Sequence, residues 1–404
     1  MAVAYLGVRG DGVADGLHGP VFLPFTLPDE EVLVEFGAPS PKLLAIERAS
    51  VDRVGPICRH FGDCGGCRLQ HWRHAPYLVW KRGLVLEALR AQGIEAHVAS
   101  IVDAHGAGRR RAIFHARRDA KGTHVGFMRM GSHAIIAIEE CPILAPSMAM
   151  SLSVATDVAE ILTKSNKPLD IAVTATDAGL DIAVKGHGPL TPAESERVVA
   201  LATRHDLARC ANHNEVIVER RQPLMVIGSC RVAPPPGVFL QPTMQGEAAL
   251  AALVADGVGE ARNIVDLFCG IGPFALRLAA KAQISAFDSE ADAIAALIKA
   301  ARGVSGLKPV RGEARDLFRR PLLPLEINGF DAIILNPPRQ GAQAQIRELA
   351  RSRALRVVYV SCNAATFARD AAVLIRSGFR LERVTPVDQF RYNFHVELVG
   401  VFIR

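Results

Sequence analysis

The chain has few cysteines, and it lacks long apolar runs and internal repeats. Eight cysteines among 404 residues are too few for a disulfide scaffold of this length. Charged residues such as Asp266 and Arg277 interrupt the apolar stretches before they reach the roughly 18 residues that a membrane-spanning helix needs. The first residues lack the basic-then-apolar layout of a secretory signal. We therefore expect a soluble, cytoplasmic protein with reduced thiols and no membrane partner.

The composition is that of an ordinary globular protein. Hydrophobic residues make up 50% and charged residues 22% of the chain, which excludes wholesale disorder and low-complexity polymers. At roughly 150 residues per domain, 404 residues correspond to two or three domains. The formal net charge of +6 permits a polyanionic partner without demonstrating one. No feature predicts an obligate protein partner.

The residue pattern changes twice along the chain, which predicts three domains. Residues 1–54 have short strand patterns broken by Gly and Pro, which are typical of a small β-barrel. Residues 55–235 hold a cysteine-rich segment and then mixed helix and strand patterns. Residues 236–404 follow a triple proline and alternate helices with short buried strands. That alternation predicts an α/β fold with a doubly wound, mostly parallel sheet.

Within the last segment, individual elements can be predicted from periodicity and apolar runs. The expected strands are 263–268, 284–288, 331–335 and 356–361, with a closing pair near 381–387 and 394–403. The expected helices are 246–256, 273–281, 291–302 and 364–377. Further upstream, we expect a helix around 77–92 and strands at 133–138 and 169–173.

Three cysteines form a tight group with the spacing C-x5-C-x2-C. They are Cys58, Cys64 and Cys67, and two glycines precede the last of them, so that the backbone can wrap around one centre. Cys141, in a Cys-Pro pair, is the best candidate for a fourth thiolate ligand. Such a site could hold zinc or an iron–sulfur cluster. The five intervening residues exceed the usual zinc spacing, which favours iron–sulfur.

A glycine-containing loop joins a predicted buried strand to a predicted helix in VDLFCGIGPFAL. Gly270 and Gly272 would let a nucleotide lie against the backbone, where a side chain would collide with the ligand. Asp288, at the end of the next predicted strand, could accept hydrogen bonds from ribose hydroxyls. The loop also matches the G-x-G-x-x-A form of the dinucleotide fingerprint. An NAD-dependent dehydrogenase therefore stays open at this point.

Three later motifs place reactive side chains at strand ends. Asn336 in NPPR presents an amide that can both donate and accept, as reading a base edge requires. Cys362 in SCN precedes a predicted helix, whose N-terminus should lower the pKa of a thiol and activate a nucleophile. His395 and Glu397 should share one face of the last strand by the period of two. Glu397 is set among apolar residues and should have a raised pKa, which suits a general base.

With the glycine loop, NPPR, SCN and HVE in this order, the chain resembles the RNA uracil-5-methyltransferases that use S-adenosylmethionine. It most resembles the branch that acts on 23S ribosomal RNA and carries an iron–sulfur cluster. The resemblance implies an RNA-binding TRAM barrel over 1–54 and a central domain over 55–235 with a [4Fe–4S] cluster. It also implies a Rossmann-like class I methyltransferase domain over 236–404.

The resemblance further implies a role for individual residues. The implied S-adenosylmethionine contacts are Gln241, Phe268, Asp288 and Asn336, beside the loop glycines Gly270 and Gly272. The implied cluster ligands are Cys58, Cys64, Cys67 and Cys141. Cys362 corresponds to the nucleophile that adds to C6 of uracil, and Glu397 to the base that takes the proton from C5.

Some residues depart from the family pattern, and other functions compete with the leading one. Pro273, Arg391 and Asn393 differ from the usual family residues, which bears on the target nucleotide more than on the chemistry. The same reaction on tRNA is the nearest alternative, followed by the dehydrogenase and by an RNA chaperone without catalysis. Basic residues that could meet RNA phosphates are Arg109, Arg110, Arg111, Arg117, Arg118 and Lys121.

Overall fold

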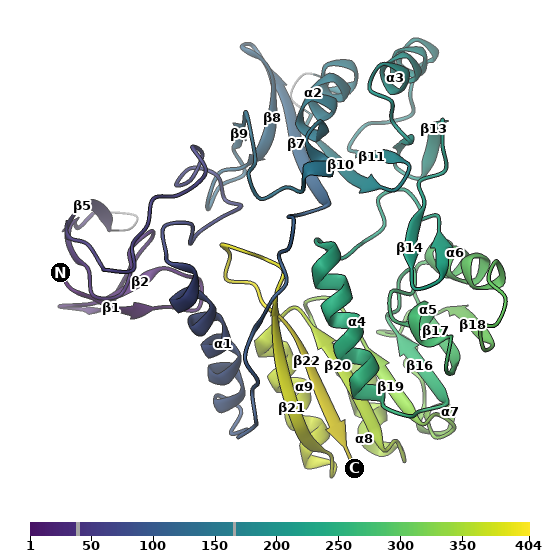
Figure 1. The fold of residues 1–404 in the computed structure, drawn as a ribbon. Coiled ribbons are helices and arrows are strands. Elements are labelled where there is room, and N and C mark those ends of the chain that lie inside the picture. The colour runs from purple at the N-terminus through teal and green to yellow at the C-terminus, as the bar shows by residue number, and fades with distance from the viewer. Residues whose placement is uncertain (38–40, 165–166) are drawn as a thin grey trace.

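Two large sheets organise the molecule, one formed by the middle of the chain and one mainly by its C-terminal part (Figure 1). The computed structural model describes residues 1–37, 41–164 and 167–404. In Figure 1 the middle sheet lies above the C-terminal sheet, and the N-terminal strands lie to one side of both. The α/β class predicted from the sequence is confirmed.

The N-terminal part forms two small antiparallel sheets. One contains Val3–Leu6 (β1), Gly12–Gly16 (β2) and Gly19–Leu23 (β3), and the other Glu31–Glu35 (β4) and Lys42–Arg48 (β5). A bridge between Ala2 and Glu31 connects the two sheets. Leu6 packs against Leu69 and Trp72, so that these sheets rest on the cysteine-rich segment that follows them.

The middle of the chain forms a seven-stranded sheet with the order β13-β12-β11-β10-β7-β8-β9. Its strands are Arg111–Asp119 (β7), Gly122–Met128 (β8), Ile135–Ala137 (β9), Leu169–Thr176 (β10), Gly179–Lys185 (β11), Arg209–Asn212 (β12) and Glu215–Glu219 (β13). Two helices, Ser151–Leu162 (α2) and Pro192–Arg204 (α3), pack on it, and a 3-10 turn at Pro146–Met148 precedes α2. Val154 and Val158 of α2 join Phe114 of β7 in the core between helix and sheet.

The C-terminal part builds an eight-stranded sheet with the order β18-β17-β16-β19-β20-β22-β21-β6. Its strands are Val102–Asp103 (β6), Asn263–Leu267 (β16), Gln283–Asp288 (β17), Val310–Ala314 (β18), Ala332–Leu335 (β19), Arg356–Ser361 (β20), Arg380–Asp388 (β21) and Glu397–Ile403 (β22). Its helices are Met244–Val258 (α4), Ala275–Leu278 (α5), Ala291–Arg302 (α6), Pro324–Ile327 (α7), Gln343–Arg351 (α8) and Ala364–Arg376 (α9). The strand order changes direction between β16 and β19, and ligands of open α/β sheets bind at such a switch point.

Hydrophobic layers cover both faces of this sheet, and segments from upstream contribute to them. The hairpin of Met225–Ile227 (β14) and Cys230–Val232 (β15) packs into the layer that contains α4 and α6. Helix His74–Arg90 (α1) packs beside α9 on the other face (Figure 1). Val85 and Leu89 of α1 belong to the same core cluster as Phe367 of α9. The segment that carries Cys58, Cys64 and Cys67 therefore leads directly onto the C-terminal sheet.

The sequence located most elements of the C-terminal sheet but misplaced the start of the last strand. Helix 291–302 and strand 356–361 lie where the pattern predicts them, whereas β18 and α8 were not predicted. The last strand begins at Glu397, so His395 lies in the turn before it. The prediction that the two share a strand face was therefore wrong. Among the described residues, no helix is long and apolar enough to cross a membrane.

Candidate active site

The carboxyl ends of β16, β17 and β19 meet at one edge of the sheet, which we call the cofactor edge. The Gly270 N–H donates a hydrogen bond to Asp288 Oδ2 (2.8 Å), which joins the loop after β16 to the end of β17. The Asn336 N–H donates to the Leu267 carbonyl (3.1 Å), which joins the end of β19 to β16. Gly270, Asp288 and Asn336, which the sequence placed on separate strands, thus lie along one edge.

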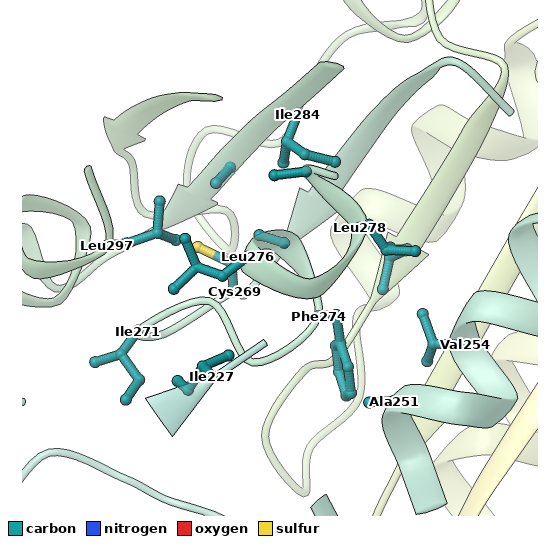
Figure 2. Packing of buried hydrophobic residues seen from close by; sticks show 14 of the residues in the cluster. Ile227, Ala251, Val254, Cys269, Ile271, Phe274, Leu276, Leu278, Ile284 and Leu297 are labelled. Carbon is teal, nitrogen blue, oxygen red and sulfur yellow. The ribbon is translucent and has the colours of Figure 1, made fainter. Parts of the chain in front are cut away.

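The two loop glycines are needed for different reasons. Gly270 has φ +54°, and a Cβ there would find no atom within 4 Å, so its outer side is open. Gly272 has φ +82°, and a Cβ there would lie 2.5 Å from Cδ1 of Leu297 on α6. Figure 2 shows Leu297 and Leu276 packed beside this loop. Open space for a ligand is thus found only at Gly270, and the predicted ligand collision is wrong for Gly272, where packing excludes a side chain.

A buried carboxylate supports this loop from beneath. Asp266 Oδ2 accepts a hydrogen bond from the Ala275 N–H (3.1 Å) at the start of α5. Burial raises the pKa of Asp266 to about 7, and the nearby Asp288 charge adds to this shift. Phe268, between strand and loop, has φ +61°, and its ring lies 5.3 Å from that of Phe318. The conformation of the loop is therefore set by its own backbone and by its contacts with Asp266 and Phe318.

Gln241 reaches the same region from the segment before α4. Its Oε1 accepts a hydrogen bond from Gln389 Nε2 (2.6 Å), and its carbonyl accepts one from Arg110 Nε (3.1 Å). Arg110 is also paired with the buried Glu247 (2.5 Å). Arg110, which the sequence suggested as a phosphate contact, is thus occupied by a buried ion pair.

The ends of β20 and β22 form a second site, which we call the catalytic edge. Ser361 pairs with Leu398 across these antiparallel strands, which brings the adjacent Cys362 and Glu397 together. Glu397 is buried, and burial raises its pKa to about 7, against a hydrogen bond from Gln389. The raised pKa predicted for this carboxyl group is confirmed.

The predicted lowering of the Cys362 pKa is wrong. Burial and then the Glu397 charge raise the pKa of this thiol to about 11, while Arg339 opposes the shift. The amides at the start of α9 do not compensate, because Asn363 Oδ1 accepts from the N–H groups of Ala365 (3.0 Å) and Thr366 (3.3 Å). Desolvation therefore outweighs the helix N-terminus at this cysteine.

Two residues at the catalytic edge were not assigned a role from the sequence. Arg339 Nη2 lies 3.0 Å from His395 Nε2 and also faces the Cys362 thiol. Burial and then Arg339 lower the pKa of His395 to about 4, so the ring is neutral and can accept this hydrogen bond. Gln389 connects Gln241 with Glu397. Arg339 could have been found from the sequence, because it ends the NPPR motif. Nothing in the local sequence indicates a role for Gln389.

All four candidate ligand cysteines line one cavity of about 340 Å³. The Gly66 N–H donates to Cys64 Sγ (3.5 Å), and burial raises the pKa of Cys67 to about 11 and that of Cys141 to about 12. In the described part of the chain, no group of three or more Cys, His, Asp or Glu side chains is arranged so that it could hold a metal ion. The arrangement of these side chains therefore does not by itself support zinc or an iron–sulfur cluster.

The cysteine-rich segment also holds the connection between β21 and β22. The N–H groups of Arg68 and Leu69 donate to the Tyr392 carbonyl (2.7 and 3.1 Å). Asn393 Nδ2 donates to the Gly66 carbonyl (3.1 Å). Residues 389–396, the connecting segment that leads to Glu397, are therefore bound to the backbone around Cys67.

Comparison with known proteins assigns the chain to a family. The profile described as tRNA (Uracil-5-)-methyltransferase matches residues 234–404. An uncharacterized RNA methyltransferase of Brucella suis is 46% identical over 404 residues, which cover 100% of this chain and 97% of that protein. The 23S rRNA (uracil(1939)-C(5))-methyltransferase RlmD of Pseudomonas fluorescens is 33% identical over 375 residues, or 88% of this chain and 82% of that protein. The chain belongs to the RNA uracil-5-methyltransferase family.

A solved structure agrees with this assignment at the level of the fold. The tRNA (uracil-54, C5)-methyltransferase of Pyrococcus abyssi, solved with S-adenosyl-L-homocysteine, matches with a TM-score of 0.76 and 22% identity over 100% of both chains. The predicted family and enzyme class, an RNA uracil-5-methyltransferase, are confirmed. The dehydrogenase alternative, which rested on the glycine loop alone, is excluded by this family membership.

Proposed function

We propose that this protein transfers a methyl group from S-adenosylmethionine to C5 of a uridine in 23S ribosomal RNA. The observation that carries the proposal is the meeting of Cys362 and Glu397 at the ends of β20 and β22, beside the cofactor edge. The 33% identity with the Pseudomonas fluorescens 23S rRNA enzyme over 88% of this chain favours ribosomal RNA as the substrate.

Cys362 acts as the nucleophile. C5 of uracil is a poor nucleophile, so the thiolate first adds to C6 and the electron pair moves to an enolate that makes C5 reactive. Arg339, whose positive charge favours the thiolate over the thiol, assists this addition. C5 would then bond to the methyl group as the bond between that group and the sulfonium sulfur of S-adenosylmethionine breaks.

Glu397 acts as the base that completes the reaction. It removes the C5 proton, the electron pair restores the C5–C6 double bond, and the Cys362 thiolate leaves. A carboxyl group with a pKa of about 7 is well matched to proton removal near neutral pH. Gln389, hydrogen-bonded to Gln241 (2.6 Å), positions this carboxylate relative to the cofactor edge.

The cofactor edge fits S-adenosylmethionine, which supplies an electrophilic methyl group when bound. Each Asp288 oxygen accepts one backbone hydrogen bond, which leaves carboxylate lone pairs for ribose hydroxyls. The open side of Gly270 lets a ligand lie against the backbone. Gln241, Phe268 and Asn336 border the same region and complete the proposed binding set.

The target uridine has to leave its stack before C5 and C6 can be reached. We propose that the Asn336 amide, which directly follows β19 at the cofactor edge, reads the polar edge of the flipped base. The small sheets of residues 1–54, proposed as a TRAM-type barrel, would contact RNA outside this pocket.

We propose that the four cysteines hold a [4Fe–4S] cluster. Cys58, Cys64, Cys67 and Cys141 face one cavity, and a cluster separates its thiolate ligands more widely than one ion does. Methyl transfer requires no electron transfer, so the cluster would organise the segment that binds residues 389–396. Anaerobically purified protein should contain iron and acid-labile sulfide, and stoichiometric zinc in their place would overturn this assignment.

The reaction is tested by incubating anaerobically purified protein with labelled S-adenosylmethionine and unmodified 23S rRNA or tRNA. We expect label at C5 of one uridine in 23S rRNA. Label in tRNA alone would move the substrate assignment to the tRNA alternative, and absence of label in both would overturn the proposed function. Methylation by Cys362→Ala at the wild-type rate would refute the nucleophile.

A further inference from the structure

A second cavity adjoins the active site. It measures about 320 Å³ and lies between the start of the middle sheet and the segment before α4. Leu240 and Pro242, on either side of Gln241, line it, and so does Phe390, which follows Gln389. Because Gln241 and Gln389 are hydrogen-bonded to each other (2.6 Å), the wall of this cavity is also the wall of the active site.

Two arginines in this cavity lack an anionic partner. Arg109 and Arg111 both line it, and neither forms an ion pair with a described carboxylate. Arg111 Nη2 donates only to the Gly237 carbonyl (3.3 Å), and its Nε is buried without a partner. Burial lowers the pKa of Arg111, which marks a guanidinium that has lost water without gaining a counter-charge. Arg110, between them in sequence, is by contrast paired with Glu247.

The two arginines differ in what else they face. Arg109 also lines the cavity of the four cysteines, so a cluster there would be a neighbouring negative charge for it. Arg111 does not line that cavity, although Cys141 lines both cavities. An anion bound in the second cavity would therefore be recognised chiefly by Arg111.

Aromatic rings accompany these charges. Phe239 is 64% exposed although it precedes the buried Leu240, and it lines the cavity. Phe390 lies on another wall, with the Arg109 guanidinium 6.0 Å from its ring centre. An exposed aromatic face, as at Phe239, next to unpaired guanidinium groups can hold an unstacked nucleotide through base stacking and contacts to phosphate or base edges.

We propose that this cavity binds a nucleotide that flanks the target uridine, with its base stacked on Phe239 and its phosphate contacting Arg111. The inference rests on the proposed function, since it assumes an RNA strand in the adjacent active site. Capture of the neighbour helps to hold the target uridine out of its stack, because two adjacent nucleotides then leave the helix together. The cavity also selects RNA by the shape of that neighbour.

The test uses a 23S rRNA fragment that the wild-type enzyme methylates, with 2-aminopurine placed in turn at each position flanking the target uridine. We expect binding to quench the fluorescence at one flanking position through stacking on Phe239. Phe239→Ala should abolish that quenching and raise the KM for RNA about tenfold, with S-adenosylmethionine affinity unchanged. Unchanged cofactor affinity also shows that the variant is folded.

A second pair of variants distinguishes a specific contact of Arg111 from a general effect of positive charge. Arg111→Gln should raise the KM for RNA about tenfold, and Arg111→Lys should restore part of the loss. Arg197→Gln, at an exposed arginine of α3 to which no RNA contact is assigned, serves as the matched control and should leave KM within twofold. If the wild type methylates the fragment, but no flanking position is quenched and both cavity variants keep wild-type KM, this inference fails alone. Absence of methylation by the wild type would instead count against the proposed function.

Discussion

The cofactor edge and the catalytic edge belong to one sheet but are built by different means. At the cofactor edge, backbone hydrogen bonds hold the strand ends together, as in the hydrogen bond from the Gly270 N–H to Asp288 (2.8 Å). At the catalytic edge, the half-buried Cys362 and the buried Glu397 have pKa values of about 11 and about 7. A binding edge can be prepared by local geometry, whereas a reactive edge requires desolvation that only distant segments can supply.

The largest effect is expected at Cys362, the proposed nucleophile of the catalytic edge. Cys362→Ala should lower kcat at least about a thousandfold, because it removes the thiol that is proposed to add to C6. S-adenosylmethionine affinity, measured by calorimetry, should stay within about twofold if the two edges are independent. A large loss of cofactor affinity would show that the edges are one unit.

Removal of the base should produce a different defect at the same edge. Glu397→Gln should reduce turnover by roughly a hundred- to ten-thousandfold. Because the C5 proton then stays in place, the thiol cannot leave, and a covalent protein–RNA complex should accumulate on a denaturing gel. Loss of turnover with no complex at any time would contradict the assigned order of steps.

The pH dependence should report the two shifted groups. Glu397 is a base only above its pKa of about 7, and the thiolate fraction of Cys362 grows about tenfold per pH unit below about 11. We expect kcat/KM to rise from about pH 6 to about pH 9 without a plateau near neutrality. A plateau of kcat/KM reached near neutral pH would argue against a high thiol pKa in the free enzyme.

At the cofactor edge, the effect should be smaller and confined to binding. Asp288→Asn should weaken S-adenosylmethionine binding about tenfold, because one carboxylate acceptor becomes an amide donor facing the Gly270 N–H. Glu290→Gln, an exposed change in the same turn, is the control and should bind within about twofold. Equal losses in both variants would indicate a general charge effect.

The smallest effect is expected at the contact between the cysteine-rich segment and the catalytic edge. Asn393→Ala removes the hydrogen bond to the Gly66 carbonyl (3.1 Å) and should lower kcat about two- to tenfold. The iron content of the purified variant should not change. A wild-type kcat would show that the other contacts, such as those of Arg68 and Leu69 to Tyr392, suffice to hold residues 389–396.

Local patterns in the sequence were enough to predict the elements that carry the cofactor edge. The strand-loop-helix at 263–278 has short-range signals, namely a buried run, two glycines and a helix start, and each is read within a few residues. Gln389 and Arg339 were not given roles, because their importance arises from contacts with Gln241, Glu397 and Cys362, which are distant in sequence.

The order of the motifs by itself determined the family, and the alternation of helices and strands determined the α/β class. The same motifs suggested the proposed pairing of a cysteine nucleophile with a glutamate base. Tertiary structure decided how those groups are tuned. Burial, which depends on the whole fold, overrode the local helix terminus at Cys362 and raised the pKa of its thiol to about 11. It also decided that Arg110 is locked in an ion pair while Arg111 faces a cavity, a distinction that adjacent, identical residues cannot reveal in sequence.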